Sequence, residues 1–291
     1  MRYGVFSVSM PEYGIDETIE ILAKLGYEGV EWRVKEIPTD IPSEIPYENR
    51  YWIDNKSTLD IDNLEVLAPQ VAQKCKAAGL AIFGLATYLM PKDVERIIPV
   101  LEAAKRIGCP MVRVFPYAYD GKQDYSQIFD KAKQEVKSLE ALARNYSVKI
   151  VMEIHMDTII ASPSSAYRLL KDCDPRYIGL IFDPGNLVYE GYENYLKSFQ
   201  LLKAYIAHVH VKNGCLVEEG KDSFGARKFK RLWTPLKDGM ANLSELFSVM
   251  KIMGYDQTIS IEDFSNEEET IEKLASNLEY LKLLEKEILY K

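Results

Sequence analysis

Short runs in which apolar and polar residues alternate recur along the chain, and longer amphipathic runs separate them. Such short runs are typical of β-strands, because successive side chains of a strand point to opposite faces. Strands that alternate with helices predict a parallel sheet with helical crossovers. We predict eight strands, at residues 3–8, 29–34, 80–86, 111–115, 149–154, 178–183, 206–211 and 258–262. Eight strands favour a closed (β/α)8 TIM barrel of the α/β class over an open sheet.

The segments between the predicted strands carry helical periodicity. Apolar residues recur every three or four positions in two of them: Phe129, Ala132, Val136, Leu139 and Ala143 in one, and Ile271, Leu274, Ala275, Leu278 and Leu281 in the other. These stripes are expected to pack on the barrel. Glycines at four helix-to-strand junctions suit left-handed C-caps and support the count of units: Gly26, Gly79, Gly108 and Gly254.

The length of 291 residues and the hydrophobic content of 47% fit one barrel domain over residues 1–291 better than two domains. Two connections are long. Residues 35–60 are rich in proline and aromatic residues, and residues 213–239 follow the seventh strand. We expect both to be irregular and to lie over the carboxyl-terminal mouth of the barrel, where such loops commonly carry specificity.

The net charge of -8 argues against nucleic acid or an anionic membrane surface as a partner. The four cysteines are scattered without a CxxC pair, which predicts neither a disulfide framework nor a zinc ribbon and favours a reducing cytoplasm. The apolar part of the first 14 residues is too short for a signal peptide, and no stretch approaches the roughly 20 apolar residues of a membrane span.

Four ionisable residues close the last four predicted strands: Glu153, Asp183, His210 and Glu262. Each lies on the strand face opposite to the apolar set, which must face the surrounding helices. The four side chains are therefore expected to point into the barrel at its carboxyl-terminal end, where barrels of this kind keep their active sites. Several carboxylates buried together are costly without a cation, so the pattern predicts one metal site.

Three carboxylates and one imidazole suit a divalent ion such as Mn²⁺, Mg²⁺, Co²⁺ or Zn²⁺. A metal in that position polarises a carbonyl group and stabilises a neighbouring enolate, as proton transfer next to a carbonyl requires. Glu153 and Glu262 are the candidate acid and base. The residues alone therefore predict metal-assisted proton transfer next to a carbonyl group.

The chain resembles the xylose isomerase-like family of sugar phosphate isomerases and epimerases over nearly its whole length. The matching segments are GYEGVEW, VMEIH, IFDPGN, HVHVKN, LKDGMANLSEL and GYDQTISIEDF. The resemblance implies that the four residues above are the metal ligands. It also implies a metal-dependent isomerase or epimerase of a small sugar, which is the main hypothesis. In such an enzyme, Glu153 and Glu262 move a proton between two faces of the sugar through an enediolate. Asn186 stands where many members have a histidine, so it can bond a hydroxyl but not shuttle a proton.

Further residues are candidates for contacts with a sugar or a sugar-like small molecule. The predicted substrate contacts are His155, Asn186, Lys212 and, in a basic loop segment, Arg227. Arg33 could also bind substrate. On strand parity, Glu31 and Arg113 are expected to pair across the lumen, and His208 lies one layer below His210, where it supports a ligand rather than binding metal.

Two alternatives stay open, and the histidine count argues against a third, a nuclease. A dehydratase acting on an inosose or on dehydroshikimate would use the same metal and base to expel water. A non-catalytic sugar-binding barrel is possible on fold alone. The related endonuclease branch needs many histidines for three zinc ions, and this chain has three histidines in all. The family resemblance also makes a homodimer or homotetramer possible.

Overall fold

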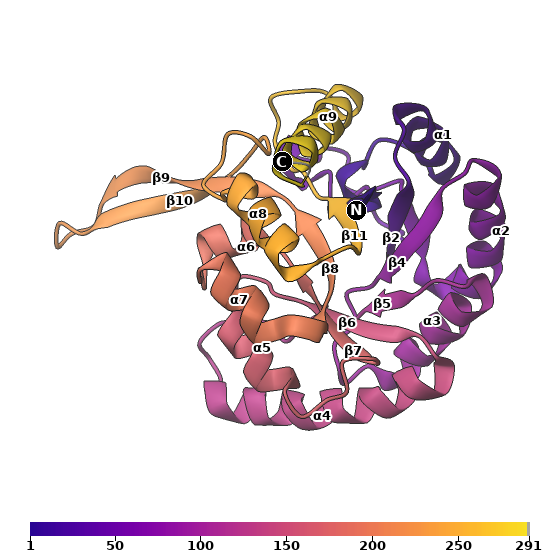
Figure 1. The fold of residues 1–291 in the computed structure, drawn as a ribbon, viewed down its shortest axis with the longest axis horizontal. Coiled ribbons are helices and arrows are strands. Elements are labelled where there is room, and N and C mark those ends of the chain that lie inside the picture. Colours follow the sequence, from indigo (N-terminus) through magenta and orange to yellow (C-terminus); the bar gives the residue numbers. More distant parts are fainter. Residues whose placement is uncertain (290–291) are drawn as a thin grey trace.

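Eight parallel strands close into a barrel at the centre of the molecule (Figure 1). The computed structural model describes residues 1–289. The barrel strands are β1 (Arg2–Phe6), β2 (Gly29–Lys35), β4 (Ala81–Ala86), β5 (Met111–Arg113), β6 (Lys149–Glu153), β7 (Ile178–Phe182), β8 (Ile206–Val211) and β11 (Thr258–Ile261). They pair in chain order, and β1 pairs with both β2 and β11, which closes the cylinder. The predicted (β/α)8 TIM barrel is confirmed.

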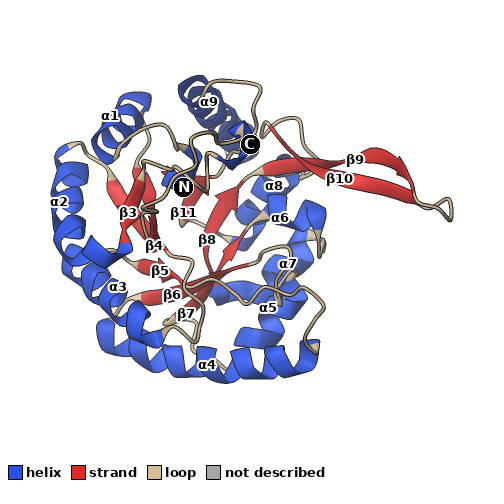
Figure 2. Cartoon of the chain, turned by 180° about the vertical axis from the view of Figure 1, so that it is seen from behind, coloured by secondary structure: helices blue, strands red, loops and turns tan. Residues whose placement is uncertain are grey.

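Helices surround the strands on the outside of the barrel (Figure 2). They are α1 (Ile15–Leu25), α2 (Leu64–Ala77), α3 (Val94–Ile107), α4 (Tyr125–Tyr146), α5 (Pro163–Leu170), α6 (Pro184–Tyr189), α7 (Tyr195–Leu202), α8 (Leu243–Met253) and α9 (Thr270–Leu289). Short 3-10 turns occupy Ser7–Ser9, Tyr47–Asn49, Ile61–Asn63 and Lys203–Tyr205. Within residues 1–289, no helix has the length and apolar character needed to cross a membrane.

The amphipathic stripe of α4 packs as predicted, since its five apolar positions are all buried. The stripe predicted for α9 is partly wrong, because Ile271 and Ala275 are exposed. Lys273 and Asn277 are buried in their place. Lys273 Nζ donates a hydrogen bond of 2.9 Å to the carbonyl of Ser265, and the Asn277 amide donates one of 2.8 Å to Asp263. These bonds to the segment after β11 place Lys273 and Asn277, and not Ile271 and Ala275, on the buried face of α9.

The two long connections differ in structure. In residues 35–60, β3 (Thr58–Asp60) pairs in parallel with β2, and the ring of Trp52 lies 5.1 Å from that of Phe264. The expectation that residues 213–239 are irregular is wrong. They form an antiparallel hairpin of β9 (Asn213–Lys221) and β10 (Arg227–Thr234), which projects away from the barrel (Figure 1). The signal that predicts it is the turn that contains Gly225, whose φ of +88° suits a hairpin connection.

The inside of the barrel is layered. Phe83, Met111, Val151 and Ile181 form an apolar cluster that fills the lumen. Because strand side chains alternate, the next inward residues toward the carboxyl ends are Arg113, Glu153 and Asp183, one on each of three strands. The polar site thus rests on an apolar floor that positions it at the mouth of the barrel.

Candidate metal centre

The four predicted ligands meet at the carboxyl ends of neighbouring strands. Glu153 closes β6, Asp183 follows β7, His210 lies on β8 and Glu262 follows β11. One ligand atom from each lies within 4.8 Å of those of the other three, and all four residues are buried. The structure therefore brings together the whole set that strand parity selected.

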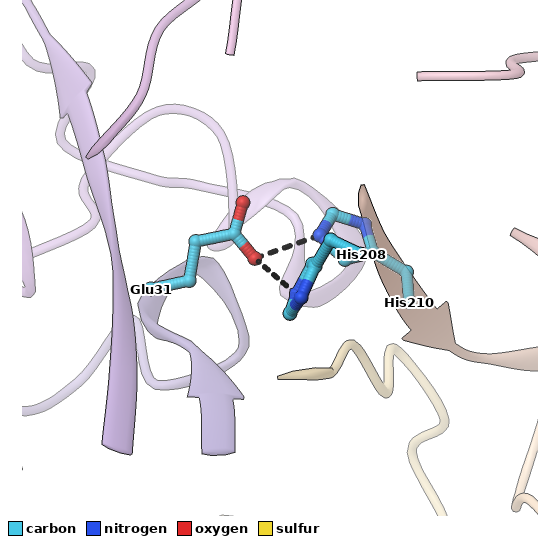
Figure 3. Close-up of side chains that lie close together, drawn as sticks. All are labelled: Glu31, His208 and His210. Atoms are coloured by element: carbon cyan, nitrogen blue, oxygen red, sulfur yellow. Dashed lines mark hydrogen bonds and ion pairs between the residues drawn. The ribbon is translucent and has the colours of Figure 1, made fainter. Parts of the chain in front are cut away.

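Glu31 on β2 holds the two histidines of β8 (Figure 3). His210 Nε2 donates to Glu31 Oε2 at 2.7 Å, and His208 Nε2 lies 3.3 Å from the same oxygen. His208 also bonds Thr258 Oγ1 at 2.7 Å and Ser260 Oγ at 2.8 Å, so both of its ring nitrogens have partners. Although Glu31, His208 and His210 lie close enough to ligate an ion, they form a hydrogen-bonded triad in which His208 has no nitrogen left for one.

The other nitrogen of His210 faces the carboxylates. Its Nδ1 atom is buried and has no hydrogen-bond partner among the residues that the structure describes. It lies 3.5 Å from Glu153 and 3.8 Å from Glu262. Because Nε2 carries the proton that Glu31 accepts, Nδ1 is the nitrogen that can offer a lone pair to a cation once it has released its own proton. An orphaned imidazole nitrogen beside three carboxylates fits a divalent metal ion, which Glu153, Asp183, His210 and Glu262 would hold.

Two buried cations contact the same carboxylates. Lys212 Nζ lies 2.9 Å from Asp183 and 3.9 Å from Glu153, and it forms an ion pair and hydrogen bond with Glu262. Arg113 Nη1 lies 2.6 Å from Glu153 Oε2. Buried carboxylates need such partners, because an unpaired charge in the interior is strongly unfavourable. The prediction that Arg113 pairs with Glu31 is wrong, since each of them has a different partner.

These contacts set opposite protonation tendencies. Burial would raise the pKa of Glu153, but Arg113 and His210 outweigh it and hold the pKa well below its usual range. Burial raises the pKa of Asp183 to about 7, against the opposing effect of Lys212. Burial lowers the pKa of His210, yet the carboxylates of Glu31 and Glu153 raise it well above its usual value overall. Glu153 is thus ionised at neutral pH, whereas a bound cation would displace protons from Asp183 and His210.

Asn186 belongs to the ligand cluster itself. Asp183 caps α6, and its Oδ1 accepts from the backbone N–H groups of Gly185 at 2.9 Å and Asn186 at 3.1 Å. The Asn186 side-chain amide then donates to Glu153 at 2.9 Å and to Asp183 at 3.0 Å. The helix start therefore fixes two ligands relative to each other, and the residue predicted to contact substrate bridges them.

The remaining predicted contacts lie in different places. The His155 ring packs 5.0 Å from Phe115, one inward position above Glu153. Arg227 lies at the outer end of the β9–β10 hairpin, where it forms a 3.5 Å ion pair with Glu218 and its side chain is 66% exposed. The structure does not bring Arg227 to the ligand cluster.

Comparisons with known proteins agree with this architecture. The sequence profile described as "Xylose isomerase-like TIM barrel" matches residues 19–284 and confirms the resemblance found in the sequence motifs. An inosose dehydratase of Lacticaseibacillus casei is 31% identical over 152 residues. The match covers 50% of this chain, and the chain spans about half (50%) of that relative's length. An inosose dehydratase of Bacillus cereus strain AH820 is 24% identical over 84% of this chain and 82% of its own length.

Solved structures share the fold at lower identity. A probable 3-DHS dehydratase from Bacillus anthracis superposes with a TM-score of 0.71 at 17% identity, over 97% of this chain and 99% of its own. A 3-keto-D-glucoside 4-epimerase from E. coli gives 0.70 at 15% identity over 97% and 99%. The IOLI protein, described with a bound zinc atom, gives 0.70 at 17% identity over 99% of each chain. At these identities the likeness establishes the barrel alone.

Proposed function

Because this chain belongs to the xylose isomerase-like TIM barrel family, we propose that it is a metal-dependent dehydratase of a cyclic polyol ketone, of the inosose type. The observation that carries the proposal is the buried cluster of Glu153, Asp183, His210 and Glu262 around the unpartnered His210 Nδ1. The inosose dehydratase relatives and the 3-DHS dehydratase fold neighbour support the choice of a lyase over the isomerase that the sequence motifs favoured.

The residues of the cluster would divide the reaction between them. A divalent ion bound there supplies polarisation of the substrate carbonyl. Glu153 or Glu262 takes the proton from the neighbouring carbon, and the electron pair of the broken C–H bond moves onto the carbonyl oxygen. The same proton then leaves with the hydroxyl of the next carbon as water, while the returning electron pair forms the C=C bond. Lys212, held among the carboxylates, stabilises negative charge on the substrate oxygens.

A second candidate is an epimerase. Glu153 and Glu262 come from strands on either side of those that carry Asp183 and His210, so the two glutamates approach the cluster from different directions. That arrangement suits proton removal from one face of a carbon and return on the other face. The epimerase among the structural neighbours has the same fold.

One experiment separates these functions. The metal-loaded protein would be incubated in D₂O with inososes, ketoses and dehydroshikimate, and the products analysed by NMR and mass spectrometry. Loss of one water supports the dehydratase, whereas deuterium uptake with all oxygens retained supports the epimerase. Both signals should disappear in Glu153→Gln and Glu262→Gln.

Glu140→Gln is the matched control, because Glu140 is a buried glutamate of α4 that pairs with Lys137 away from the lumen. It should react like the wild type. Neither water loss nor deuterium uptake from any compound would overturn the proposed chemistry.

A further inference from the structure

A row of charged residues rises along the inner face of β2 from the metal centre to the mouth. Glu31, Arg33 and Lys35 alternate with apolar residues and so share one face of the strand. Glu31 lies at the level of His210, which it contacts, and the two cations follow above it.

Arg33 is buried, with only 3% of its surface exposed, yet all of its partners are neutral. Its guanidinium donates to Thr58 Oγ1 at 2.5 Å, to the Trp52 carbonyl at 3.2 Å and to Tyr88 Oη at 3.4 Å. Among the side chains that the structure describes, no carboxylate forms an ion pair with it. Arginine is almost never buried without an anionic partner, so the arrangement points to an anion that arrives with a ligand.

Lys35 repeats this pattern at the rim. No hydrogen bond or ion pair ties its ammonium to any described residue, and its Nζ atom lies 5.6 Å from the centre of the Tyr88 ring. Burial and the nearby Arg33 lower its pKa. The adjacent carboxylate, Glu36, is engaged by Arg96 instead. Two neighbouring cations therefore lack a counter-charge at the same place.

Tyr88 connects these cations to the metal centre. Its ring lies 5.4 Å from the Arg33 guanidinium and 5.0 Å from that of Arg113, which binds Glu153. The guanidinium groups of Arg33 and Arg113 thus both contact the ring of Tyr88. A ligand that reaches the metal centre past Tyr88 would come within reach of Arg33.

A cavity of about 640 Å³ opens beside this row. Its lining includes Trp52, the cations of Arg33, Lys35 and Lys56, and the carboxylates of Glu36 and Asp54. Trp52 relates this cavity to the metal centre, because the ring of Phe264 lies 5.1 Å from that of Trp52 and 5.6 Å from Lys212 Nζ. The volume is ample for a substituent of a small polyol.

Charge balance indicates which substituent. The four buried carboxylates at the metal centre are Glu31, Glu153, Asp183 and Glu262. Arg113, Lys212 and a divalent ion would together carry four positive charges and neutralise them. At the mouth, Glu36 pairs with Arg96, and the charges of Asp54 and Lys56 offset each other. Arg33 and Lys35 then remain as two surplus positive charges, and an anionic group would remove that cost.

We propose that Arg33 and Lys35 bind an anionic group of the substrate, a carboxylate or a phosphate, while the carbonyl end of the substrate lies at the metal centre. The inference rests on the proposed function, because it extends the same site. It narrows the substrate class from polyol ketones in general to those that carry a negative charge.

Equilibrium binding to the metal-loaded protein tests this inference. Isothermal titration calorimetry would compare neutral myo-inositol with quinate, a cyclic polyol carboxylate, and with myo-inositol 1-phosphate. The wild type should bind at least one of the two anions about 10- to 100-fold more tightly than myo-inositol. The preferred anion then identifies carboxylate or phosphate.

Variants locate the anion. Arg33→Met and Lys35→Met should each remove most of that preference while leaving the affinity for myo-inositol unchanged. Lys35→Met breaks no hydrogen bond of the described structure, so it reports even if Arg33→Met fails to fold. Lys149→Met removes one positive charge at the opposite end of the barrel, at the start of β6, and should keep the preference.

Two results would overturn the inference: no preference of the wild type for either anion, or a preference that survives in both variants, as direct binding of the anion to the metal would give. The outcome is independent of turnover. Dehydration of a neutral inosose without anion preference would leave the proposed function standing and remove the anion site. Anion binding that depends on Arg33, without reaction of any compound, would support the anion site and remove the proposed function.

Discussion

Replacing Glu31 with alanine should weaken the binding of a divalent ion about 10- to 100-fold, although Glu31 is not expected to touch the ion. Glu31 Oε2 accepts the Nε2 hydrogen of His210 at 2.7 Å. That bond keeps the lone pair of Nδ1 directed at the carboxylates. Without it, His210 can rotate or move its proton to Nδ1, and either change removes a ligand.

The magnitude follows from what each histidine loses. His208 keeps its bonds to Thr258 and Ser260 in Glu31→Ala, so it stays satisfied. The only hydrogen bond that the structure gives His210 Nε2 within the described residues is the one to Glu31. A buried donor left without a partner costs about 1–3 kcal/mol. At about 1.4 kcal/mol per tenfold in affinity, this corresponds to a loss of roughly 5- to 150-fold.

Calorimetric titration of Mn²⁺ or Zn²⁺ into chelator-treated protein measures the effect. Glu31→Gln should fall between the wild type and Glu31→Ala, because its carbonyl oxygen can still accept from His210. Ser260→Ala is the control, since it removes a partner of His208 but none of His210. A folded Glu31→Ala protein that binds metal with wild-type affinity would refute the orienting role.

Three further outcomes are expected. Lys212→Met should destabilise the metal-free protein by about 3–5 kcal/mol, because three buried carboxylates lose their shared cation. The rise in melting temperature on adding metal should then be larger than in the wild type, and an unchanged rise would contradict this. Metal affinity should fall as the pH drops below about 7, because protons compete with the metal for Asp183 and His210. Burial raises the pKa of Asp183 to about 7. Metal titrations between about pH 8 and about pH 6 measure this fall, and an affinity that does not change with pH would contradict it. Gly185→Ala should lower the free energy of unfolding by about 1–3 kcal/mol in urea denaturation. The added Cβ would lie 2.4 Å from Lys212 Cγ and 2.8 Å from the Lys212 carbonyl oxygen. A wild-type midpoint would show that β8 and α6 can move apart freely.

The gathering of the four candidate metal ligands could be predicted from the sequence. Strand side chains alternate with a period of two, so the apolar set of each strand determines which residues face the lumen. Parallel barrel strands all end at the same rim. Glu153, Asp183, His210 and Glu262 therefore had to gather once the fold was known, and periodicity together with the helix-capping glycines predicted that fold.

The partners across the lumen could not be predicted in this way. Parity places Glu31 inside, but whether it meets Arg113 or His210 depends on the stagger of strands far apart in the sequence and on side-chain rotamers. The same limit applies outside the barrel, where bonds from Lys273 and Asn277 to residues beyond β11 decide which face of α9 is buried. The period of a strand or helix is a local property of the chain and determines which face is buried. The partner that this face meets is decided only when distant segments pack together.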